Sequence, residues 1–232
     1  MAIIDITGLI QNGMWNYEYP FPEFTLKKLP KIEWLDNDIF CEIFDGIHSQ
    51  TGTYLETPAH FYGNDKCYLI NDVPLEKLVN MKGVAVQVKK DFGRKERVPI
   101  TLEDIVRAFE NVQIEEGDAV LVGTGWGKYW MDGFYLDSSP YFTYDAMKWL
   151  IGKKPYLLAT DFPRWENLDN RQGFFPEFYS GNILMLAPCI NLEKIGNARI
   201  RLTALPMNII GTSCVPCRAF VSMEQVKELD EG

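Results

Sequence analysis

The sequence predicts a mixed α/β fold in one domain that spans residues 1–232. Three observations lead to this prediction. Short apolar, β-branched runs alternate with stretches of helical period along the middle of the chain. Apolar residues make up 47% and charged residues 24%, as in globular proteins. No internal repeat, low-complexity tract or flexible linker divides the chain.

The middle of the chain carries the clearest elements. Residues 83–90 (GVAVQVKK) are apolar and β-branched, which predicts a strand. Thr101 predicts the start of a helix, because Thr101 and Asp104 resemble a capping box and apolar residues follow at helical spacing. Thr143 predicts the start of a second helix. Further strands are predicted at residues 118–124, 155–159 and 182–186.

The two flanks differ from the middle. Residues 1–62 are rich in Pro, Gly and aromatic residues, with short strands predicted at residues 2–5 and 38–44. Late strands are predicted at residues 202–210 and 217–223. An aromatic loop at residues 127–141 is long enough for a lid or an oligomer contact, and it is equally compatible with an ordinary surface loop.

The charge and hydropathy of the chain exclude some classes of function. The net charge is −9 and the sequence pI is near 4.8, without a basic run, which argues against binding to nucleic-acid phosphates. No apolar run is long enough to span a bilayer, and the N-terminus shows no signal peptide. We therefore expect a cytoplasmic protein with a small-molecule substrate and without a nucleic-acid or membrane partner.

The five cysteines predict reduced thiols rather than a disulfide framework. Cys214 and Cys217 form a C-x-x-C pair, which is typical of redox sites and of half a zinc cluster. A redox pair opens a helix after a strand, whereas the residues around Pro216 predict a strand. Redox chemistry is therefore a minor alternative, which a thiol of lowered pKa would support.

The chain contains only two histidines, His48 and His60, and both lie in one polar segment at residues 48–61. A zinc site with three histidines is therefore impossible within one chain, and a histidine general base must be one of these two. The segment is also compatible with a polar strand and turn whose side chains only satisfy backbone groups.

Polar side chains recur along this segment at even spacing. If it is extended, Gln50, Tyr54 and Glu56 share one face. Gly52 permits a bend, and Pro58 ends regular pairing so that His60 can face back. A carboxylate, an imidazole, a phenol and an amide that converge in this way predict an acid–base or metal site.

The segment resembles the signature H-x-G-T-H-x-D-x-P-x-H of the cyclase family, which includes bacterial kynurenine formamidases and isatin hydrolases. Residues 50–60 read QTGTYLETPAH, with the Gly, Thr, Pro and last His in register. Residues 117–126 resemble the family's G-D-x-V-L-x-x-T-G-W strand, and residues 159–161 its G-x-D strand end. Similar matches at residues 191–192, 205–206 and 216–218 follow in the right order. The resemblance implies a swivelling β/β/α domain, a metal-dependent hydrolase and a homo-oligomer.

The sequence departs from the family at most of the metal ligands. The first two signature histidines fall at Gln50 and Tyr54, and the bridging aspartate falls at Glu56. The later ligands that the family often adds fall near Phe175 and Ala187, which cannot bind a metal. Two chemistries stay open.

The first chemistry uses one divalent cation (Mn²⁺, Mg²⁺ or Zn²⁺), held weakly by Gln50, Glu56 and His60. This oxygen-rich set suits Mg²⁺ or Mn²⁺ better than zinc. The second needs no metal: His60 acts as general base, Glu56 orients it, and Tyr54 and Gln50 donate hydrogen bonds to an oxyanion.

An apolar pocket is expected beside these residues. Phe175, Trp15 and Trp126 are the candidate substrate-binding residues, with Trp165 as a further wall, and each tryptophan is equally compatible with an ordinary core position. We expect a hydrolase or cyclase that acts on an amide, lactone or ester carbonyl of a small aryl or cyclic substrate, in the manner of an arylformamidase. The alternative is an inactive relative that binds a small molecule or serves as an oligomeric scaffold.

Overall fold

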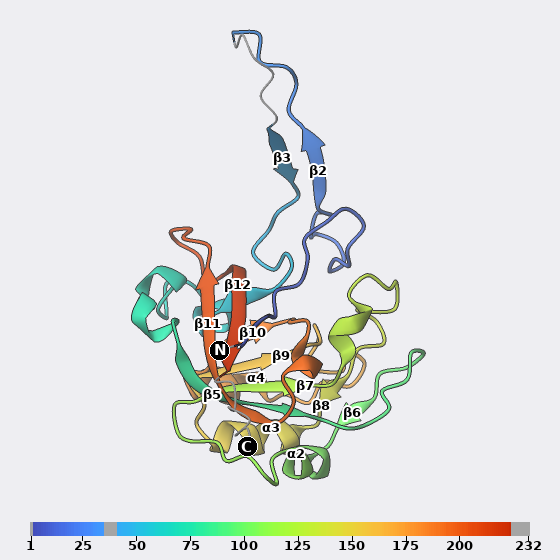
Figure 1. Ribbon diagram of the computed structural model, residues 1–232, viewed down its shortest axis with the longest axis vertical. Coiled ribbons are helices and arrows are strands. Elements are labelled where there is room, and N and C mark those ends of the chain that lie inside the picture. Colours follow the sequence, from blue (N-terminus) through green and yellow to red (C-terminus); the bar gives the residue numbers. More distant parts are fainter. Residues whose placement is uncertain (1, 35–40, 224–232) are drawn as a thin grey trace, which may run out of the picture.

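A curved eight-stranded sheet forms the centre of the protein, as Figure 1 shows for the computed structural model, which describes residues 2–34 and 41–223. The strand order is β1-β12-β11-β5-β7-β9-β10-β4, and β4 also pairs with β12, so that the sheet closes on itself. The strands are β1 (Ala2–Asp5), β4 (Tyr54–Glu56), β5 (Met81–Gln87), β7 (Ala119–Gly123), β9 (Leu157–Thr160), β10 (Leu184–Ala187), β11 (Ala198–Pro206) and β12 (Cys214–Met223).

Four neighbouring strands, β5, β7, β9 and β10, run parallel because a helix connects each to the next. These crossover helices are α2 (Leu102–Ala108), α3 (Tyr144–Gly152) and α4 (Phe175–Ser180). The remaining pairs in the sheet are antiparallel. The predicted mixed α/β class is therefore confirmed.

The sheet separates two hydrophobic cores. Val84, Val86 and Val120 face the helices, whereas Ala85 and Leu121 face the interior of the curled sheet. This split follows from the two-residue period of a strand. Since both faces are covered, the central strands read as continuous apolar runs.

Most predicted elements form close to the predicted positions. Thr101 caps α2 in a capping box with Asp104, and the Thr143 side chain caps α3. The strand predicted at residues 202–210 begins and ends earlier, as β11, and the one predicted at residues 217–223 begins earlier, at Cys214. Both cysteines of the C-x-x-C pair lie in β12, although the predicted strand included only Cys217.

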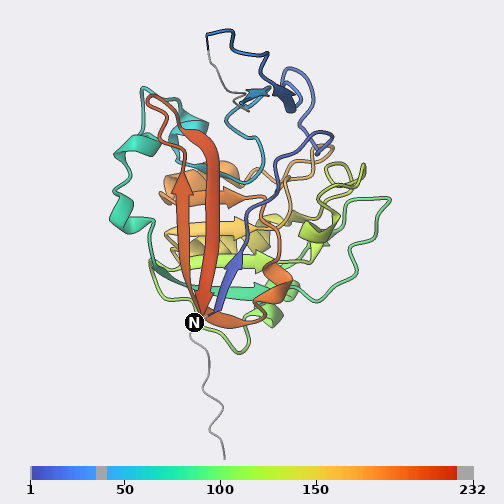
Figure 2. The same cartoon turned by 45° about the horizontal axis from the view of Figure 1, so that its top comes forward.

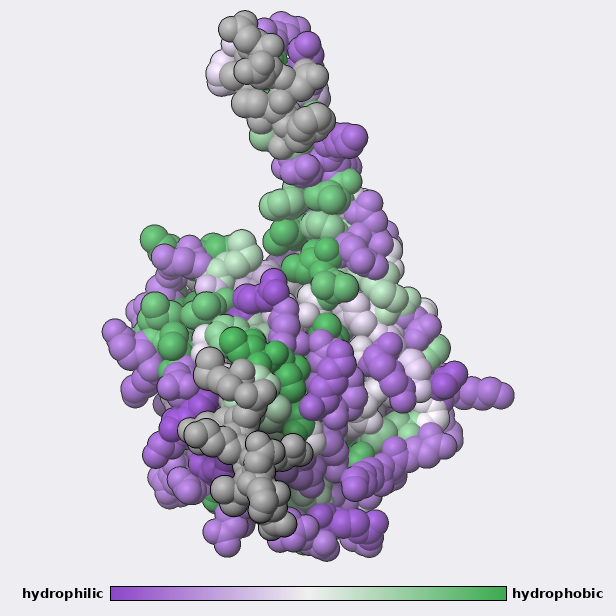
Figure 3. Space-filling view, viewed as in Figure 1, coloured by the Kyte–Doolittle hydropathy of each residue, from purple (hydrophilic) through white to green (hydrophobic). Residues whose placement is uncertain are grey.

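A hairpin arm projects from the body (Figures 1 and 2) and consists of β2 (Thr25–Lys28) and β3 (Glu42–Asp45). The strand predicted at residues 38–44 overlaps β3, and its residues 38–40 lie outside the described residues. Leu26 and Phe44 face each other across the arm and are 49% and 63% exposed. Figure 3 shows the apolar surface that gathers along the arm and at its base.

The remaining elements are short. They are α1 (Ala59–Tyr62), β6 (Pro99–Ile100), β8 (Tyr141–Phe142) and the 3₁₀ turns η1 (Ile70–Asp72), η2 (Leu75–Lys77), η3 (Trp126–Tyr129) and η4 (Leu192–Lys194). In the aromatic loop at residues 127–141, Trp130 and Tyr135 are buried, so this loop packs into the core rather than forming a lid. Among the described residues, no helix has the length and apolarity to cross a membrane.

Candidate functional site

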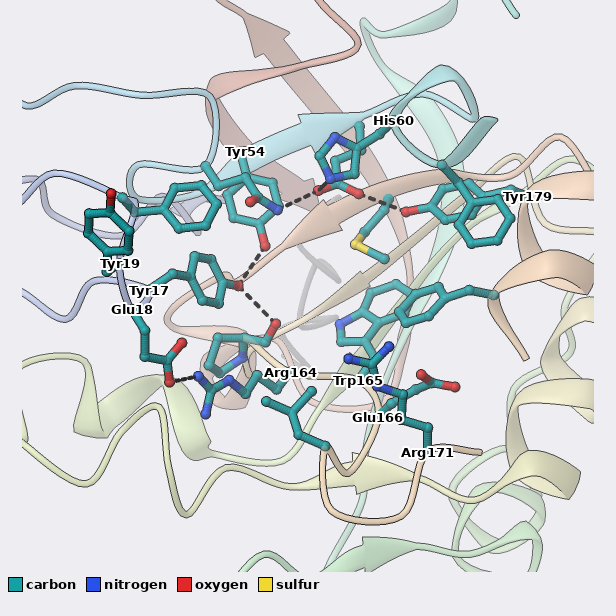
Figure 4. Close-up of a pocket in the computed structure, with 18 residues that line it drawn as sticks. Tyr17, Glu18, Tyr19, Tyr54, His60, Arg164, Trp165, Glu166, Arg171 and Tyr179 are labelled. Atoms are coloured by element: carbon teal, nitrogen blue, oxygen red, sulfur yellow. Dashed lines mark hydrogen bonds and ion pairs between the residues drawn. The ribbon is translucent and has the colours of Figure 1, made fainter. Parts of the chain in front are cut away.

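A cavity of about 510 Å³ opens beside β4 (Figure 4). Five segments line it: the loop around Tyr17, the segment at residues 50–61, the loop at residues 163–171, helix α4 and, through Met185, strand β10. The polar segment that the sequence singled out therefore lies against a space large enough for a small molecule.

Strand β4 is short but firmly placed, because β10 pairs with one of its edges and β12 with the other. Tyr54 and Glu56 line the cavity, whereas Leu55 between them packs into the interior of the curled sheet. Gly52 has a φ of +72° and lies so close to Ile10 that a Cβ would come within 2.9 Å of its side chain. This bend brings Gln50 back towards Glu56. The extended conformation expected from Gln50 onwards begins only at Tyr54.

Glu56 is the centre of the site and its side chain is only 2% exposed. Oε1 accepts a hydrogen bond from Gln50 Nε2 at 2.9 Å, and Oε2 accepts one from the Tyr179 hydroxyl at 2.7 Å. His60 Nε2 lies 3.5 Å from Oε1, and Cys214 Sγ lies 3.7 Å from the same oxygen. Four polar groups therefore converge on one buried carboxylate.

His60 reaches this carboxylate because α1 begins directly after Pro58. The turn after β4, in which His60 N donates to the Thr57 carbonyl oxygen at 3.0 Å, brings His60 to the same side as Glu56. The His60 side chain remains 36% exposed and lines the cavity. The second histidine, His48, lies away from the cavity, with Nε2 3.0 Å from Asn16 Oδ1. Burial lowers the pKa of His48 below its usual value.

Tyr54 takes part in a relay of hydroxyl groups. The Tyr17 hydroxyl donates to the Pro163 carbonyl oxygen at 3.1 Å, so the Tyr54 hydroxyl must donate to Tyr17 across 2.8 Å. Burial raises the pKa of both phenols well above the usual value. The single proton of Tyr54 is therefore committed to Tyr17, which leaves it neither an ionised ligand nor a free donor to an oxyanion.

The aromatic wall differs from the predicted one. Phe175 and Trp165 line the cavity, but Trp126 and Trp15 do not. Trp126 is 1% exposed and donates from Nε1 to the Tyr135 carbonyl oxygen, and Trp15 packs against the core beside Trp130. Neither predicted substrate contact therefore lines the cavity: Trp126 is buried in the core, and the partly buried Trp15 packs against other aromatic rings.

Three stacked rings replace these tryptophans. Phe61 and Phe175 each stack on Tyr179, with centroid distances of 5.4 Å and 5.9 Å and interplanar angles below 20°. Phe175 stands where the family often places a later metal ligand, and the second such position, Ala187, is buried in β10 opposite Tyr54. The wall that results suits a flat aromatic molecule.

Sequence reasoning missed Cys214 as a site residue. Its Cα partner in the β12–β4 pairing is Glu56, so the two side chains lie on the same face of the sheet. Cys214 Sγ donates to the Ser49 carbonyl oxygen at 3.3 Å, and burial beside Glu56 raises the pKa of this thiol. Cys217, three residues further along the strand, packs into the interior core instead.

The donor set fits a divalent cation. Glu56, His60 and Cys214 each offer one ligand atom, and these atoms lie within 4.8 Å of one another. Zinc bonds of about 2.0–2.3 Å in a tetrahedral site place ligand atoms roughly 3.3–3.7 Å apart, close to the two separations measured from Glu56. Gln50, a predicted ligand, meets the carboxylate through its amide nitrogen and so acts as a donor that positions Glu56.

Asp161 marks a second buried carboxyl group, at the ends of parallel strands away from the cavity. It accepts hydrogen bonds from Thr124 N at 3.0 Å and from Thr124 Oγ1 at 2.7 Å. Burial raises its pKa to about 6, although these hydrogen bonds oppose the shift. Since an unfolded Asp titrates near ~3.9, the folded state binds this proton more tightly than the unfolded state does.

This shift predicts a pH dependence of stability. The contribution of Asp161 should be greatest below pH ~4, fall between pH ~4 and ~6, and then remain constant. We expect the free energy of unfolding of the wild type, minus that of Asp161→Asn, to fall by roughly 2–3 kcal/mol over this window. Urea unfolding at a series of pH values measures it, and a difference that rises with pH would contradict the assignment.

Comparisons with known proteins agree with this architecture. Residues 4–167 match the model of a family described as "Putative cyclase". No curated protein matches the sequence. Several solved structures are similar in fold. Isatin hydrolase A from Ralstonia solanacearum superposes with a TM-score of 0.78 at 18% identity and covers 96% of this chain and 92% of its own.

Two further structures show the same likeness. An isatin hydrolase bound to the product analogue thioisatinate has a TM-score of 0.75 at 19% identity and covers 94% of this chain and 91% of its own. A potential metal-dependent hydrolase with cyclase activity has a TM-score of 0.71 at 21% identity, with 95% and 96% covered. These likenesses extend over almost the whole length of each chain.

Proposed function

Because this chain belongs to the cyclase family, we propose that it is a metal-dependent hydrolase of small aryl or cyclic substrates. The bond cleaved would be an amide, lactone or ester bond at a carbonyl group, and N-formyl aryl amides are included. The observation that carries this proposal is the buried carboxylate of Glu56, which meets His60 at the wall of an aromatic-lined cavity. The similar structures named isatin hydrolase support a cyclic amide as the type of substrate.

Some residues around the Glu56 carboxylate position it, and others bind the cation or the substrate. Gln50 and Tyr179 each donate to one oxygen of Glu56 and hold it in place, and His60 stands beside it on the cavity side. When a divalent cation is bound by these groups, it supplies Lewis-acid polarisation of the carbonyl and acidifies water. The aryl part of the substrate stacks on the rings of Phe61 and Phe175 and excludes water from the reacting carbonyl.

A panel of substrates tests this proposal. N-formyl aryl amides, aryl lactones and isatin-type rings are offered to the protein with added Zn²⁺, Mn²⁺ or Mg²⁺, and again with a chelator. We expect turnover of one class with metal and its loss with the chelator. His60→Ala should reduce kcat/KM by at least about 10²-fold, as is common when an acid–base or metal-binding side chain is removed. His48→Gln is the comparison variant, because His48 does not line the cavity and meets the site through the Gln50 backbone N and the Phe21 ring.

The second candidate function is a binding protein without catalysis. Gln50 and Tyr54 stand where the family signature has histidines, and the Tyr54 proton is engaged with Tyr17. A protein of this kind would give no turnover with any class or metal. A rise in the melting temperature with an aryl ligand would then identify a binder, and no rise would point to a scaffold.

The stacked wall predicts a specific effect on substrate binding. Phe175→Ala removes one of the rings that face the cavity. Phe175 makes no hydrogen bond to Glu56, and its ring stacks on Tyr179, whose hydroxyl does. An aromatic contact is worth about 0.5–1.5 kcal/mol, so we expect KM to rise roughly 2–10-fold while kcat changes little. Steady-state kinetics measure both values, and a loss confined to kcat would contradict this role.

The homo-oligomer and the cytoplasmic location remain predictions. The structure describes a single chain, and the projecting arm of β2 and β3 leaves Leu26 and Phe44 exposed to solvent. Light scattering after size-exclusion chromatography measures the oligomeric state.

A further inference from the structure

Cys214 lies beside Glu56 because the register of β12 and β4 pairs these two residues. Three consecutive residues of β12 pair with three of β4, and Cys214 and Glu56 are the Cα partners at one end of this ladder. The thiol is 2% exposed and its Sγ lies 3.7 Å from Glu56 Oε1. Its position is therefore fixed by the backbone of two strands, which is the kind of rigid support that a metal ligand needs.

The carboxylate of Glu56 lacks a full counter-charge. Its hydrogen-bond donors are a neutral amide and a neutral phenol, and the thiol sulfur of Cys214 lies 3.7 Å from one of its oxygens. Among the ion pairs of the part of the chain that the structure describes, only His60 faces it. A buried carboxylate without a cation is costly, because neutral donors replace only part of the lost hydration. A metal ion at this point would supply the missing charge.

The separations of the donor atoms suit a small tetrahedral ion. The distances from Glu56 Oε1 to His60 Nε2 and to Cys214 Sγ are 3.5 Å and 3.7 Å. His60 is 36% exposed, so its ring can adjust towards the sulfur without disturbing the core. One side of the set faces the cavity, where a fourth position stays open to a water molecule or substrate, as in catalytic zinc sites.

We propose that Cys214 is a thiolate ligand of a zinc site that Glu56 and His60 complete. This inference deepens the proposed function and rests on its cation site. On binding, the S–H bond of Cys214 breaks, its proton passes to the solvent, and a sulfur–zinc bond forms. A thiolate and an imidazole favour zinc, so the expected preference for Mg²⁺ or Mn²⁺ is replaced by a preference for softer ions. Gln50 and Tyr179 support the ligand Glu56 from outside the metal sphere.

Cobalt substitution tests this ligand directly, because a cobalt–thiolate bond produces a charge-transfer absorption band in the near ultraviolet. The purified full chain is stripped of metal and titrated with Co²⁺, and then with Zn²⁺ in competition. We expect one equivalent of Co²⁺ to produce the band and Zn²⁺ to abolish it. Cys214→Ser should lose the band and bind Zn²⁺ at least about 100-fold more weakly, since even supporting residues account for 10–100-fold.

Cys217→Ser is the matched control, because Cys217 lies on the same strand but packs into the interior core. It should keep the band and the zinc affinity of the wild type. Circular dichroism shows whether each variant is folded, and Cys214→Ala provides a second variant if the serine form is not. Zinc should also protect Cys214 from alkylation in the wild type, as peptide mass spectrometry measures.

The outcomes separate this inference from the proposed function. Cobalt binding without a thiolate band, or with a band that survives Cys214→Ser, overturns the role of Cys214 and leaves metal-dependent hydrolysis standing. If no cation binds, the zinc site is overturned, and turnover in the presence of a chelator then decides whether hydrolysis proceeds without metal. A band that Cys214→Ser abolishes supports the zinc site even when no substrate in the panel is turned over.

Discussion

Glu56→Gln is expected to reduce kcat/KM by about 10³-fold or more while leaving the fold intact. The substitution keeps the size of the side chain but replaces an acceptor oxygen by an amide donor. This donor would face either the Gln50 amide or the Tyr179 hydroxyl, both of which donate to Glu56. The variant also loses the negative charge that attracts a cation, and acid–base or ligand groups of this kind contribute about 10²–10⁴-fold.

The measurement is steady-state kinetics on the best substrate of the panel, together with zinc affinity. Glu177→Gln is a suitable control, because Glu177 lies on helix α4 close to the site but binds only the exposed Tyr144 hydroxyl. A kcat/KM of Glu56→Gln within tenfold of that of the wild type would show that Glu56 takes no part in the reaction.

Arg97→Lys should cause the second large effect, on stability. The guanidinium of Arg97 donates to the backbone carbonyl oxygens of Ser139, Pro140, Arg164 and Glu166, and so ties two loops together. Burial lowers its pKa to about 10, which leaves it charged at neutral pH. A lysine ammonium cannot span four carbonyl groups, because it lacks the planar fork of arginine.

We expect this variant to lose roughly 2–4 kcal/mol of unfolding free energy, since buried carbonyl groups lose a charged donor. KM should rise as well, because Arg164 and Glu166 belong to the loop that lines the cavity. Urea unfolding measures the first effect. Arg94→Lys, which retains a cation over the partly buried Tyr129 ring, should change stability by no more than about 0.5 kcal/mol. Equal losses of unfolding free energy in Arg97→Lys and Arg94→Lys would contradict the proposal that the Arg97 guanidinium ties the two loops together.

The parallel part of the sheet could be predicted from sequence because local pattern and tertiary role agree there. The runs around Val84 and Val120 are apolar on both faces and buried on both faces. The helix caps at Thr101 and Thr143 depend on contacts three residues away, which a linear sequence displays. Strand β2 escaped prediction, because its TLKK sequence has neither a clear alternation nor a buried face.

The site could be predicted only where it is local. Gln50, Glu56 and His60 meet within eleven residues of chain, and the even spacing with the turn at Pro58 predicted their convergence. Cys214 and Tyr179 reach the same carboxylate from more than 120 residues away. Cys214 and Tyr179 approach Glu56 only because β4 pairs with both β10 and β12. The register of these pairings cannot be predicted from the spacing of residues in the sequence.

The pairing of β4 with both β10 and β12 also determines when the site can form during folding. The Glu56–Cys214 contact spans 158 residues, so the proposed metal pocket forms only when β4 and β12 have paired. Contacts between residues far apart in sequence are slow to form in folding. A nascent chain that has not yet reached Cys214 presents no such pocket. Metal capture would therefore favour the completed sheet over partly folded forms, and the apparent melting temperature should rise with free zinc concentration.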